Sequence, residues 1–352
     1  MYYFCSTIQS KVVMNYTIEI KDKSKILIGN VGELLSQHLP NKRVVVISDT
    51  NIDRHYHSLI AEYDHILIGL GETSKTIHTL DMIYRRLIEL EADRSTFILG
   101  IGGGIVTDIA GFVASTYMRG VEFGFVSTSL LGQVDASVGG KNGVNMDGYK
   151  NMIGVFNQPR FVICDVNMVR TLSHREFRTG LAEIIKAGII ADKELFEKLE
   201  VCDFTTLAGD EDLLSEIVYR AIKVKADIVE CDERETGKRR KLNLGHTMAH
   251  AIEKCSSKLN HGEAVAVGLY LIAKAATKRG VISLQECERI EQLLLRAGFT
   301  LEPPCELREL LKAVKKDKKS EGDKIHIVFP TTIGNCIVEP MPLEEFKAMM
   351  KS

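Results

Sequence analysis

Short apolar runs alternate with helical segments through the first half of the chain. Residues 44–47, 65–68 and 96–99 have the length and β-branched character of buried strands, and residues 76–90 carry apolar side chains at helical spacing. Residues 161–165 are expected to be the last strand of this half. Strands that alternate with helices in this way predict a parallel sheet with helices on both faces. In such sheets, ligands bind beyond the carboxyl ends of the strands.

A glycine-rich run leads from one of these strands into a helix expected over residues 105–118. Residues 100–108 read Gly-Ile-Gly-Gly-Gly-Ile-Val-Thr-Asp. Glycines let the backbone approach a pyrophosphate, and a helix N-terminus offers free N–H groups. Because Ile105 occupies the place of the last glycine in G-x-G-x-x-G, both dinucleotide binding and a tight structural turn remain open. Asp49, at a strand end, fits the residue that holds a ribose hydroxyl of NAD.

Polar and glycine residues dominate the stretch from 127 to 154. It contains Asp135, Lys141, Lys150 and Asn151, and we expect it to form a long polar loop. Such a loop inside a compact α/β domain is costly unless it builds a site. The stretch is therefore predicted to line the ligand site.

From about residue 171 the pattern becomes helical, and 352 residues suffice for two domains. We expect an α/β domain over residues 1–170 and a mainly α-helical domain over residues 171–352. Glu183 and Lys186 lie three residues apart, hence on one helical face, within an apolar segment. Most isolated pairs at this spacing are surface pairs, but a buried pair indicates a functional role.

Three of the ten histidines, His246, His250 and His261, lie within sixteen residues. His246 and His250 are four apart and share one face of a helix, and Glu263 closely follows His261. Imidazole with carboxylate is the usual ligand set for zinc or a similar divalent ion. Spacing alone pairs His246 with His250 as metal ligands. A polar helix end with solvated histidines is the alternative interpretation.

Composition excludes several other classes of protein. The net charge of −2 gives no reason to expect nucleic acid as a partner, and no apolar run approaches the roughly 18–20 residues that span a bilayer. The eight cysteines form no Cys-x-x-Cys pair, which indicates reduced thiols in a cytoplasmic protein. Residues 1–13 lack the features of a signal peptide and are expected to be a tail, with Met14 as an alternative start.

Seven motifs follow one another along the chain. They read Gly102-Gly-Gly104-x-x-x-Asp108-x-x-Gly111-Phe-Val-Ala-Ser, Gln133-Val-Asp135-x-Ser-Val-Gly-Gly-Lys141, Lys150-Asn-x-Ile-Gly, Gly180-x-Ala-Glu183-x-x-Lys186, Asp232-Glu-x-Glu-x-Gly-x-Arg239, Asn243-x-Gly-His246-Thr and His261-Gly-Glu. With them the chain resembles the 3-dehydroquinate synthase family from about residue 16 to about residue 346. It departs from the family pattern where Pro, Thr, Ala and Gly are common, at Ser127, Ser129, Gly132 and Ala249. None of these changes removes a charged or metal-binding group.

The resemblance implies an active site between a nucleotide-binding α/β domain and a helical domain. It implies conversion of 3-deoxy-D-arabino-heptulosonate 7-phosphate to 3-dehydroquinate and phosphate, a step of the shikimate pathway. The route implied is transient NAD-dependent oxidation, β-elimination of phosphate, reduction, ring opening and intramolecular aldol closure. NAD, zinc or cobalt, and a homodimer are implied with it.

The resemblance also assigns roles to residues. The metal ligands are Glu183, His246 and His261, which replaces the His246–His250 pair that spacing favoured. The NAD-binding residues are Asp49, Asn51, Glu72, Lys75, Gly103, Gly104, Asp108, Thr128, Ser129 and Lys150. The substrate-binding residues are Arg119, Asp135, Lys141, Asn151, Lys186, Lys225, Arg239, Asn243, His250 and Lys318 or Lys319. Lys141, Lys186, His250, Arg239 and Asn243 are the catalytic residues among them, and Arg119 is donated across the dimer interface.

Three other functions compete with this hypothesis. A related sugar phosphate cyclase would act on a substrate without the carboxylate, but Asn151 and Arg239 are expected to be replaced in such relatives. A polyol dehydrogenase, such as glycerol dehydrogenase, would use NAD and metal without the cations that bind phosphate. A binding protein without activity is the third alternative. Phosphate release without net NADH production distinguishes a cyclase from the dehydrogenase and from the binding protein.

Overall fold

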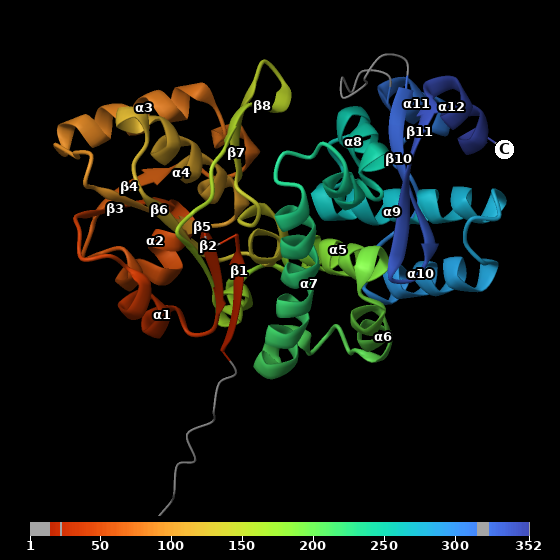
Figure 1. Ribbon diagram of the computed structural model, residues 1–352, viewed down its shortest axis with the longest axis horizontal. Helices are drawn as coiled ribbons and strands as arrows, with labels where there is room; N and C mark the ends of the chain where they lie inside the picture. Colours follow the sequence, from red (N-terminus) through yellow and green to blue (C-terminus); the bar gives the residue numbers. More distant parts are fainter. Residues whose placement is uncertain (1–14, 22, 315–323, 352) are drawn as a thin grey trace, which may run out of the picture.

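A seven-stranded sheet forms the N-terminal half of the protein, in a computed structural model that describes residues 15–21, 23–314 and 324–351. The strand order is β1-β2-β9-β6-β5-β3-β4 (Figure 1). β1 pairs antiparallel with β2, and the other neighbours are parallel. The strands are β1 (Tyr16–Ile20), β2 (Ser24–Ile28), β3 (Val44–Asp49), β4 (Asp64–Ile68), β5 (Phe97–Gly102), β6 (Phe123–Ser127) and β9 (Phe161–Cys164).

Helices cover both faces of this sheet, as the sequence predicts. Alternate side chains of β3 point to opposite faces: Val44 and Val46 pack with α1 and α2, whereas Val45 and Ile47 pack with α3 and α4. All four side chains are buried, which explains why the strand is a continuous apolar run. The helices of this half are α1 (Val31–His38), α2 (Thr50–Tyr56), η1 (His57–Leu59), η2 (Glu72–Ser74), α3 (Ile77–Glu89), α4 (Gly104–Thr116) and η3 (Tyr117–Arg119).

The stretch expected to be a long polar loop is instead ordered secondary structure. It forms the π-helical turn η4 (Gly132–Ala136) and an antiparallel hairpin of β7 (Lys141–Met146) and β8 (Tyr149–Phe156). Asp147 and Gly148 make its turn with φ of 50° and 79°, the backbone that an Asp-Gly hairpin turn requires. Val144 is fully buried, and β7 packs against α4. Lys141 and Lys150 therefore lie on the strands of an ordered hairpin and not on a loop.

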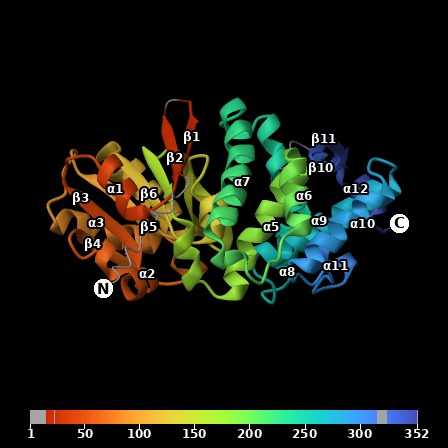
Figure 2. The ribbon, with the colours of Figure 1, turned by 90° about the horizontal axis from the view of Figure 1, so that it is seen from below.

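The C-terminal half is mainly helical, and α7 lies between it and the sheet in both ribbon views (Figures 1 and 2). Its helices are η5 (Val166–Thr171), α5 (His174–Ala191), α6 (Lys193–Val201), η6 (Leu207–Gly209), α7 (Glu211–Cys231), η7 (Lys238–Asn243), α8 (His246–Cys255), α9 (His261–Lys278), α10 (Leu284–Arg296), α11 (Leu307–Val314) and α12 (Leu343–Lys351). The expected hairpin near residues 324–338 is β10 (Lys324–Thr332) with β11 (Asn335–Pro342). The predicted tail over residues 1–13, Lys318 and Lys319 lie outside the described residues.

Candidate active site

Three side chains from three helices meet in the C-terminal half. Glu183 comes from the middle of α5, and His246 and His261 are the first residues of α8 and α9. Glu183 Oε1 lies 3.6 Å from His246 Nε2 and 3.4 Å from His261 Nε2. One ligand atom from each residue falls within 4.8 Å of the others, so the three can share one metal ion. We call this group the His–Glu cluster.

Close helix packing brings His261 to Glu183. A Cβ atom on Gly262 would lie 2.4 Å from Cα of Thr179, one helical turn before Glu183 on α5. Only glycine therefore allows the first turn of α9 to touch α5. Asn260 and Glu263 close the start of α9 in a capping box, and Arg175 pairs with Glu263. Glu263 thus caps a helix and lies outside the His–Glu cluster.

Hydrogen bonds behind the two histidines direct their rings. His246 Nδ1 lies 3.2 Å from the carbonyl oxygen of Leu244, which can only accept, so Nδ1 carries the proton and Nε2 faces Glu183 as a lone pair. His261 Nδ1 lies 3.4 Å from Glu253 Oε1. A carbonyl or carboxylate behind each imidazole is the usual outer arrangement of a metal-binding histidine.

The pKa values of the His–Glu cluster are strongly shifted. Burial raises the pKa of Glu183, but Lys186, His246 and His261 outweigh it and hold the pKa well below its usual range. Both carboxylate oxygens are buried, and they make ion pairs without a well-directed hydrogen bond. Burial lowers the pKa of His246 to about 3. Burial also lowers that of His261, yet the neighbouring carboxylates of Glu183 and Glu253 raise it to about 10. The donor set fits a divalent ion in place of this proton.

The pairing of His246 with His250 that spacing favoured does not describe this cluster. The two rings lie edge to face with centroids 5.6 Å apart, which is the distance that also separates the rings of His246 and His261. His261 is the histidine that approaches Glu183, because α9 packs along α5. His250 lies one helical turn along α8 from His246.

The glycine run forms a narrow cradle at the N-terminus of α4. Gly103 is the N-cap of this 13-residue helix. A Cβ on Gly104 would lie 2.7 Å from Ala136 Cβ, and one on Gly103 would lie 3.1 Å from Ser129 Oγ. Thr128 is buried, and its N–H donates to the carbonyl of Gly102. The free N–H groups and the close approach suit a pyrophosphate.

Other predicted nucleotide-binding residues surround this cradle. Asp49 follows β3 and caps α2, where its Oδ1 accepts from the N–H groups of Asn51 and Ile52. Glu72 Oε1 accepts from Asn145 Nδ2 at 2.7 Å, so η2 is tied to β7.

Lys75 is a buried cation beside the glycine cradle. Its Nζ lies 2.5 Å from both Asp108 Oδ2 and Asn151 Oδ1. Burial raises the pKa of Asp108 to about 6, although Lys75 opposes the shift. These contacts place Asn151, which has φ of 51°, beside Lys75 and Asp108, two of the predicted NAD-binding residues.

Two lysines of the helical half, Lys186 and Lys225, pair with carboxylates of the predicted site. Lys186 is buried one turn from Glu183; its Nζ lies 2.5 Å from Glu183 Oε2 and donates to the Leu242 carbonyl at 2.8 Å. Lys225 of α7 reaches across to η4, where it pairs with Asp135 at 2.6 Å. Burial alone would raise the pKa of Asp135, but the charges of Lys225 and Lys186 lower it below its ordinary value.

Arg239 is buried, and its two terminal nitrogens donate to the carbonyls of Glu233 and Gly139. Its Nε is buried without a partner among the described residues. Arg119 is exposed, with φ of 71° at the end of η3.

Two acidic residues of the site were not predicted from the sequence. Glu235 contacts Lys141 and accepts from Asn243 Nδ2 at 2.7 Å, and Glu253 pairs with Lys150 at 3.0 Å. Glu253 is seven residues after His246, so helical periodicity places it on the histidine face of α8. Glu235 stands in the motif that ends at Arg239. Both signals were present in the sequence.

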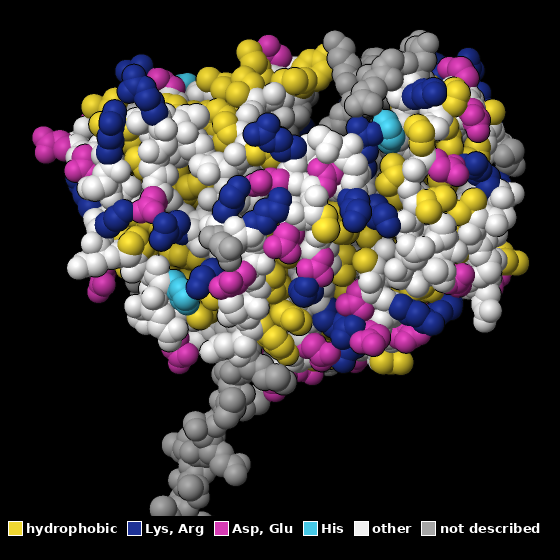
Figure 3. Space-filling model, viewed as in Figure 1, with side chains coloured by type: hydrophobic (Ala, Val, Ile, Leu, Met, Phe, Trp, Pro, Cys, Tyr) yellow, Lys and Arg dark blue, Asp and Glu magenta, His cyan; other side chains and the backbone are white. Residues whose placement is uncertain are grey.

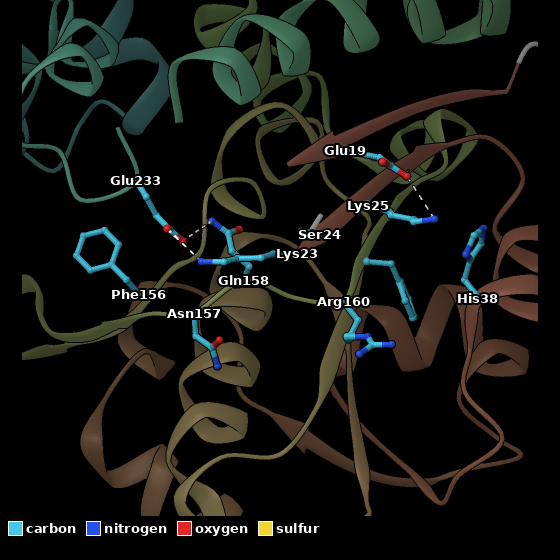
Figure 4. Close-up of a pocket in the computed structure, with 11 residues that line it drawn as sticks. Glu19, Lys23, Ser24, Lys25, His38, Phe156, Asn157, Gln158, Arg160 and Glu233 are labelled. Atoms are coloured by element: carbon cyan, nitrogen blue, oxygen red, sulfur yellow. Dashed lines mark hydrogen bonds and ion pairs between the residues drawn. The ribbon is translucent and has the colours of Figure 1, made fainter. Parts of the chain in front are cut away.

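A separate hollow of about 900 Å³ lies at the amino ends of β2 and β9, away from the carboxyl ends of the strands (Figure 4). Lys23 and Gln158 point toward Glu233 there. Its lysines, Lys23 and Lys25, are exposed and already paired with glutamates, so we do not assign catalysis to it. Across the surface in Figure 3, charged side chains of both signs are interspersed. No helix among the described residues is long and apolar enough to cross a membrane.

Comparison with known families identifies both halves of the chain. Residues 65–179 match the model described as 3-dehydroquinate synthase N-terminal, and residues 180–320 match 3-dehydroquinate synthase C-terminal. The 3-dehydroquinate synthase of Alkaliphilus metalliredigens is 40% identical over 302 residues, which cover 83% of this chain and 85% of the relative. That of Streptococcus sanguinis is 37% identical over 350 residues, or 96% and 97% of the two chains.

Solved structures share the fold at lower identity. A 2-deoxy-scyllo-inosose synthase, complexed with carbaglucose-6-phosphate, NAD⁺ and Co²⁺, has a TM-score of 0.83 at 23% identity and covers 96% of this chain and 99% of its own. The 2-epi-5-epi-valiolone synthase of Streptomyces hygroscopicus, with NAD⁺ and Zn²⁺ bound, has a TM-score of 0.83 at 24% identity and covers 93% and 95%. A probable glycerol dehydrogenase from Sinorhizobium meliloti has a TM-score of 0.62 at 14% identity and covers 94% and 95%.

Proposed function

The chain belongs to the 3-dehydroquinate synthase family, and we propose on that basis how its residues convert 3-deoxy-D-arabino-heptulosonate 7-phosphate to 3-dehydroquinate and phosphate. The observation that carries the proposal is the His–Glu cluster beside buried Lys186, with the glycine cradle contributed by the other half of the chain. We place the boundary between the two domains at residues 170 and 171, which lie between β9 and α5.

We propose that Glu183, His246 and His261 hold a divalent ion, zinc or cobalt. The anionic carboxylate and the Nε2 atoms that face it support this ligand set. When bound, the ion supplies a Lewis acid for the C4 and C5 oxygens of the substrate. The outer contacts to Leu244 and Glu253 fix the two rings before the ion arrives.

NAD is assigned to the cradle at the N-terminus of α4, with Gly103 and Gly104 against its pyrophosphate. Asp49, Asn51, Glu72, Lys75, Asp108, Thr128, Ser129 and Lys150 are the other proposed contacts. When bound, NAD supplies a hydride acceptor for C4 that later returns the hydride, so no NADH accumulates. Asp49 uses Oδ1 as a helix cap, which leaves Oδ2 for a ribose hydroxyl.

Cations that surround the leaving phosphate are the chain's main contribution to the elimination step. We assign the phosphate to Lys141, Lys186 and an Arg119 from a second protomer, because fixed positive charge stabilises the oxyanion as it departs. Lys225 and Arg239 are the proposed partners of the substrate carboxylate. Asp135, Asn151, Asn243 and His250 complete the proposed contacts, and His250 serves the proton transfers. Lys318 keeps its proposed role outside the described residues.

We propose a homodimer in which Arg119 of one chain reaches the active site of the other, as in the family that the chain resembles. Its exposure at the end of η3 supports this role, and Met118, Met152 and Phe156 are exposed apolar side chains of the same half. We also propose a cytoplasmic location. Seven cysteines of the described residues are free thiols, which suits a reducing compartment.

Phosphate release tests the reaction most directly. Purified protein with the heptulosonate phosphate, catalytic NAD and Zn²⁺ is expected to release inorganic phosphate while absorbance at the NADH band returns to its starting value. Chelation of the metal should stop the release. Lasting NADH without phosphate would instead indicate a dehydrogenase, and phosphate only from a sedoheptulose or hexose phosphate would indicate a sibling cyclase.

A further inference from the structure

Glu253 lies where the His–Glu cluster meets the β7–β8 hairpin. Its Oε1 is 3.4 Å from His261 Nδ1 and 3.0 Å from Lys150 Nζ. The Glu253 side chain is only 11% exposed, whereas that of Lys150 is 52% exposed. One buried carboxylate oxygen therefore serves two groups, one from each half of the chain.

The two groups belong to elements that make few other contacts with each other. Lys150 is the second residue of β8, near the tip of a hairpin that packs on α4 of the N-terminal half. His261 opens α9 in the C-terminal half. Figure 1 shows the hairpin standing beside the segment that leads into α8, the helix that carries Glu253.

We propose that Glu253 is a positioning residue that ties the hairpin to the metal site: its carboxylate orients His261 toward Glu183 and holds Lys150 beside the first residues of α8 and α9. The inference rests on the metal site of the proposed function. A carboxylate behind a metal-binding imidazole fixes the ring and strengthens the ligand. The same negative charge makes one of the hairpin's ionic contacts with the helical half, beside that of Lys141 with Glu235, so Lys150 is held by a group whose own position depends on His261.

Three variants separate the two functions of Glu253. Glu253→Ala removes both contacts. Glu253→Gln keeps an oxygen that can accept from His261 Nδ1 but removes the charge that attracts Lys150. Lys150→Met removes the hairpin contact and leaves Glu253 with His261.

Zinc affinity and hairpin exchange are the two measurements, made on the purified full chain. Zinc affinity is measured by competition with a chromophoric chelator, and the hairpin is followed by deuterium uptake of residues 141–156. Glu253→Ala is expected to lower zinc affinity about 10- to 100-fold and to raise hairpin uptake. Glu253→Gln should keep most of the zinc affinity and raise uptake. Lys150→Met should raise uptake as much as Glu253→Gln, with zinc affinity close to that of the wild type.

The double variant tests whether Lys150 acts through Glu253. Glu253→Ala with Lys150→Met should show no more hairpin uptake than Glu253→Ala alone, because the two changes remove the same contact. If Glu253→Ala binds zinc with wild-type affinity, Glu253 does not orient His261 for metal binding. If Glu253→Ala and Glu253→Gln both show wild-type deuterium uptake, Glu253 does not hold the hairpin. His261→Ala separates these failures from a wrong metal site: if it too binds zinc normally, the proposed ligand set is wrong.

Discussion

At the scale of single residues, the site is a group of buried charges in contact with one another. Lys186 and Glu183 are buried and in contact, and His246 and His261 contact the same carboxylate. Such a group costs desolvation free energy that its mutual attraction offsets only in part. We account for its retention in the helical core by the metal cation and the phosphate that the proposed function assigns to it.

His261→Ala is expected to remove the bound metal and to abolish turnover while the protein stays folded. The alanine leaves two ligands, and His261 is less deeply buried than Glu183, so the helix packing survives. Metal content per chain, measured after gel filtration, checks the first effect, and circular dichroism checks the fold. Stoichiometric metal in this variant would show that the ligand assignment is wrong.

Lys186→Ala is expected to lower turnover by at least about 100-fold, because a fixed charge at the leaving group contributes a few kcal/mol to the transition state. NAD affinity should change little, since Lys186 contacts Glu183 and Leu242 and not the glycine cradle. Steady-state phosphate release and fluorescence titration with NADH measure the two effects. A loss confined to NAD affinity would contradict the phosphate-binding role.

Asp232 anchors the segment that carries Glu235 and Arg239. Its carboxylate accepts from the N–H groups of Thr236, Gly237 and Arg239, and despite the opposing effect of burial these bonds lower its pKa from 3.8 to about 2. A carboxyl group whose pKa is lower in the folded state stabilises the fold above its unfolded pKa and loses that contribution as pH falls.

Asp232→Asn should therefore be less stable than the wild type at pH 6, and the difference should shrink as the pH falls from about 4 to about 2. Urea unfolding of both proteins at several pH values measures this difference. A gap in the free energy of unfolding that is independent of pH over this range would mean that the carboxylate charge plays no part. Because the N–H of Arg239 donates to the Asp232 carboxylate, Asp232→Asn should also shift Arg239 and raise the KM for the substrate.

At the scale of elements, close helix contacts decide where the ligands stand. Gly262→Ala is expected to destabilise the protein by about 1–3 kcal/mol and to weaken zinc binding, because the new Cβ meets the Thr179 backbone and pushes α9 from α5. Gly209→Ala is the matched control, since its Cβ would meet no atom within 4 Å. Urea unfolding and zinc competition check both variants. Equal zinc affinity in the two would disprove the link between this contact and His261.

The elements that could be predicted from the sequence are those with a strong local pattern. Residues 76–90 and 105–118 are α3 and α4 within two residues at each end, because their caps and apolar faces are local features. The expectation of a loop at residues 141–156 is wrong because neither strand of the hairpin alternates buried and exposed side chains. β7 buries residues 142–144 in succession, and most of β8 is exposed. The Asp147-Gly148 turn was the signal that would have revealed the hairpin.

The site shows the same limit of local reasoning. Helical spacing correctly put Glu183 and Lys186 on one face, but it favoured His250 over His261 as the partner of His246, and the cluster contains His261 instead. The position of His261 depends on α9 packing along α5 through Gly262, a contact between segments far apart in sequence. The family motifs predicted His261 as the ligand, and the α5–α9 contact explains why His261 lies beside Glu183.

At the scale of the whole molecule, ionic contacts join the two halves of the chain. Lys225 pairs with Asp135, Lys150 with Glu253, and Lys141 with Glu235. Glutamates of the helical half therefore pair with two lysines of the hairpin before substrate binds. In the proposed reaction the phosphate takes the place of Glu235 at Lys141, so binding of the anion and movement of the segment before η7 are expected to occur together.

The proposed dimer makes the last prediction, because each active site would need residues from two chains. Arg119→Ala and Lys186→Ala should each be nearly inactive alone. In a mixed dimer, the site with an intact Lys186 receives an intact Arg119 from the other chain. When the two variants are co-refolded in equal amounts, about half of the dimers contain one chain of each kind. Each of these hybrids has one complete site and one defective site. The mixture should therefore show about one quarter of wild-type activity.

The control for this experiment uses two changes that cannot complement each other. Lys186→Ala mixed with His261→Ala restores nothing if both residues serve the site of their own chain, because every site keeps one defect. Sedimentation velocity establishes that the mixed samples are dimers. Failure of Arg119→Ala and Lys186→Ala to restore activity in verified hybrid dimers would place Arg119 in the site of its own chain, and the glycine cradle and the His–Glu cluster would then form a complete site within one protomer.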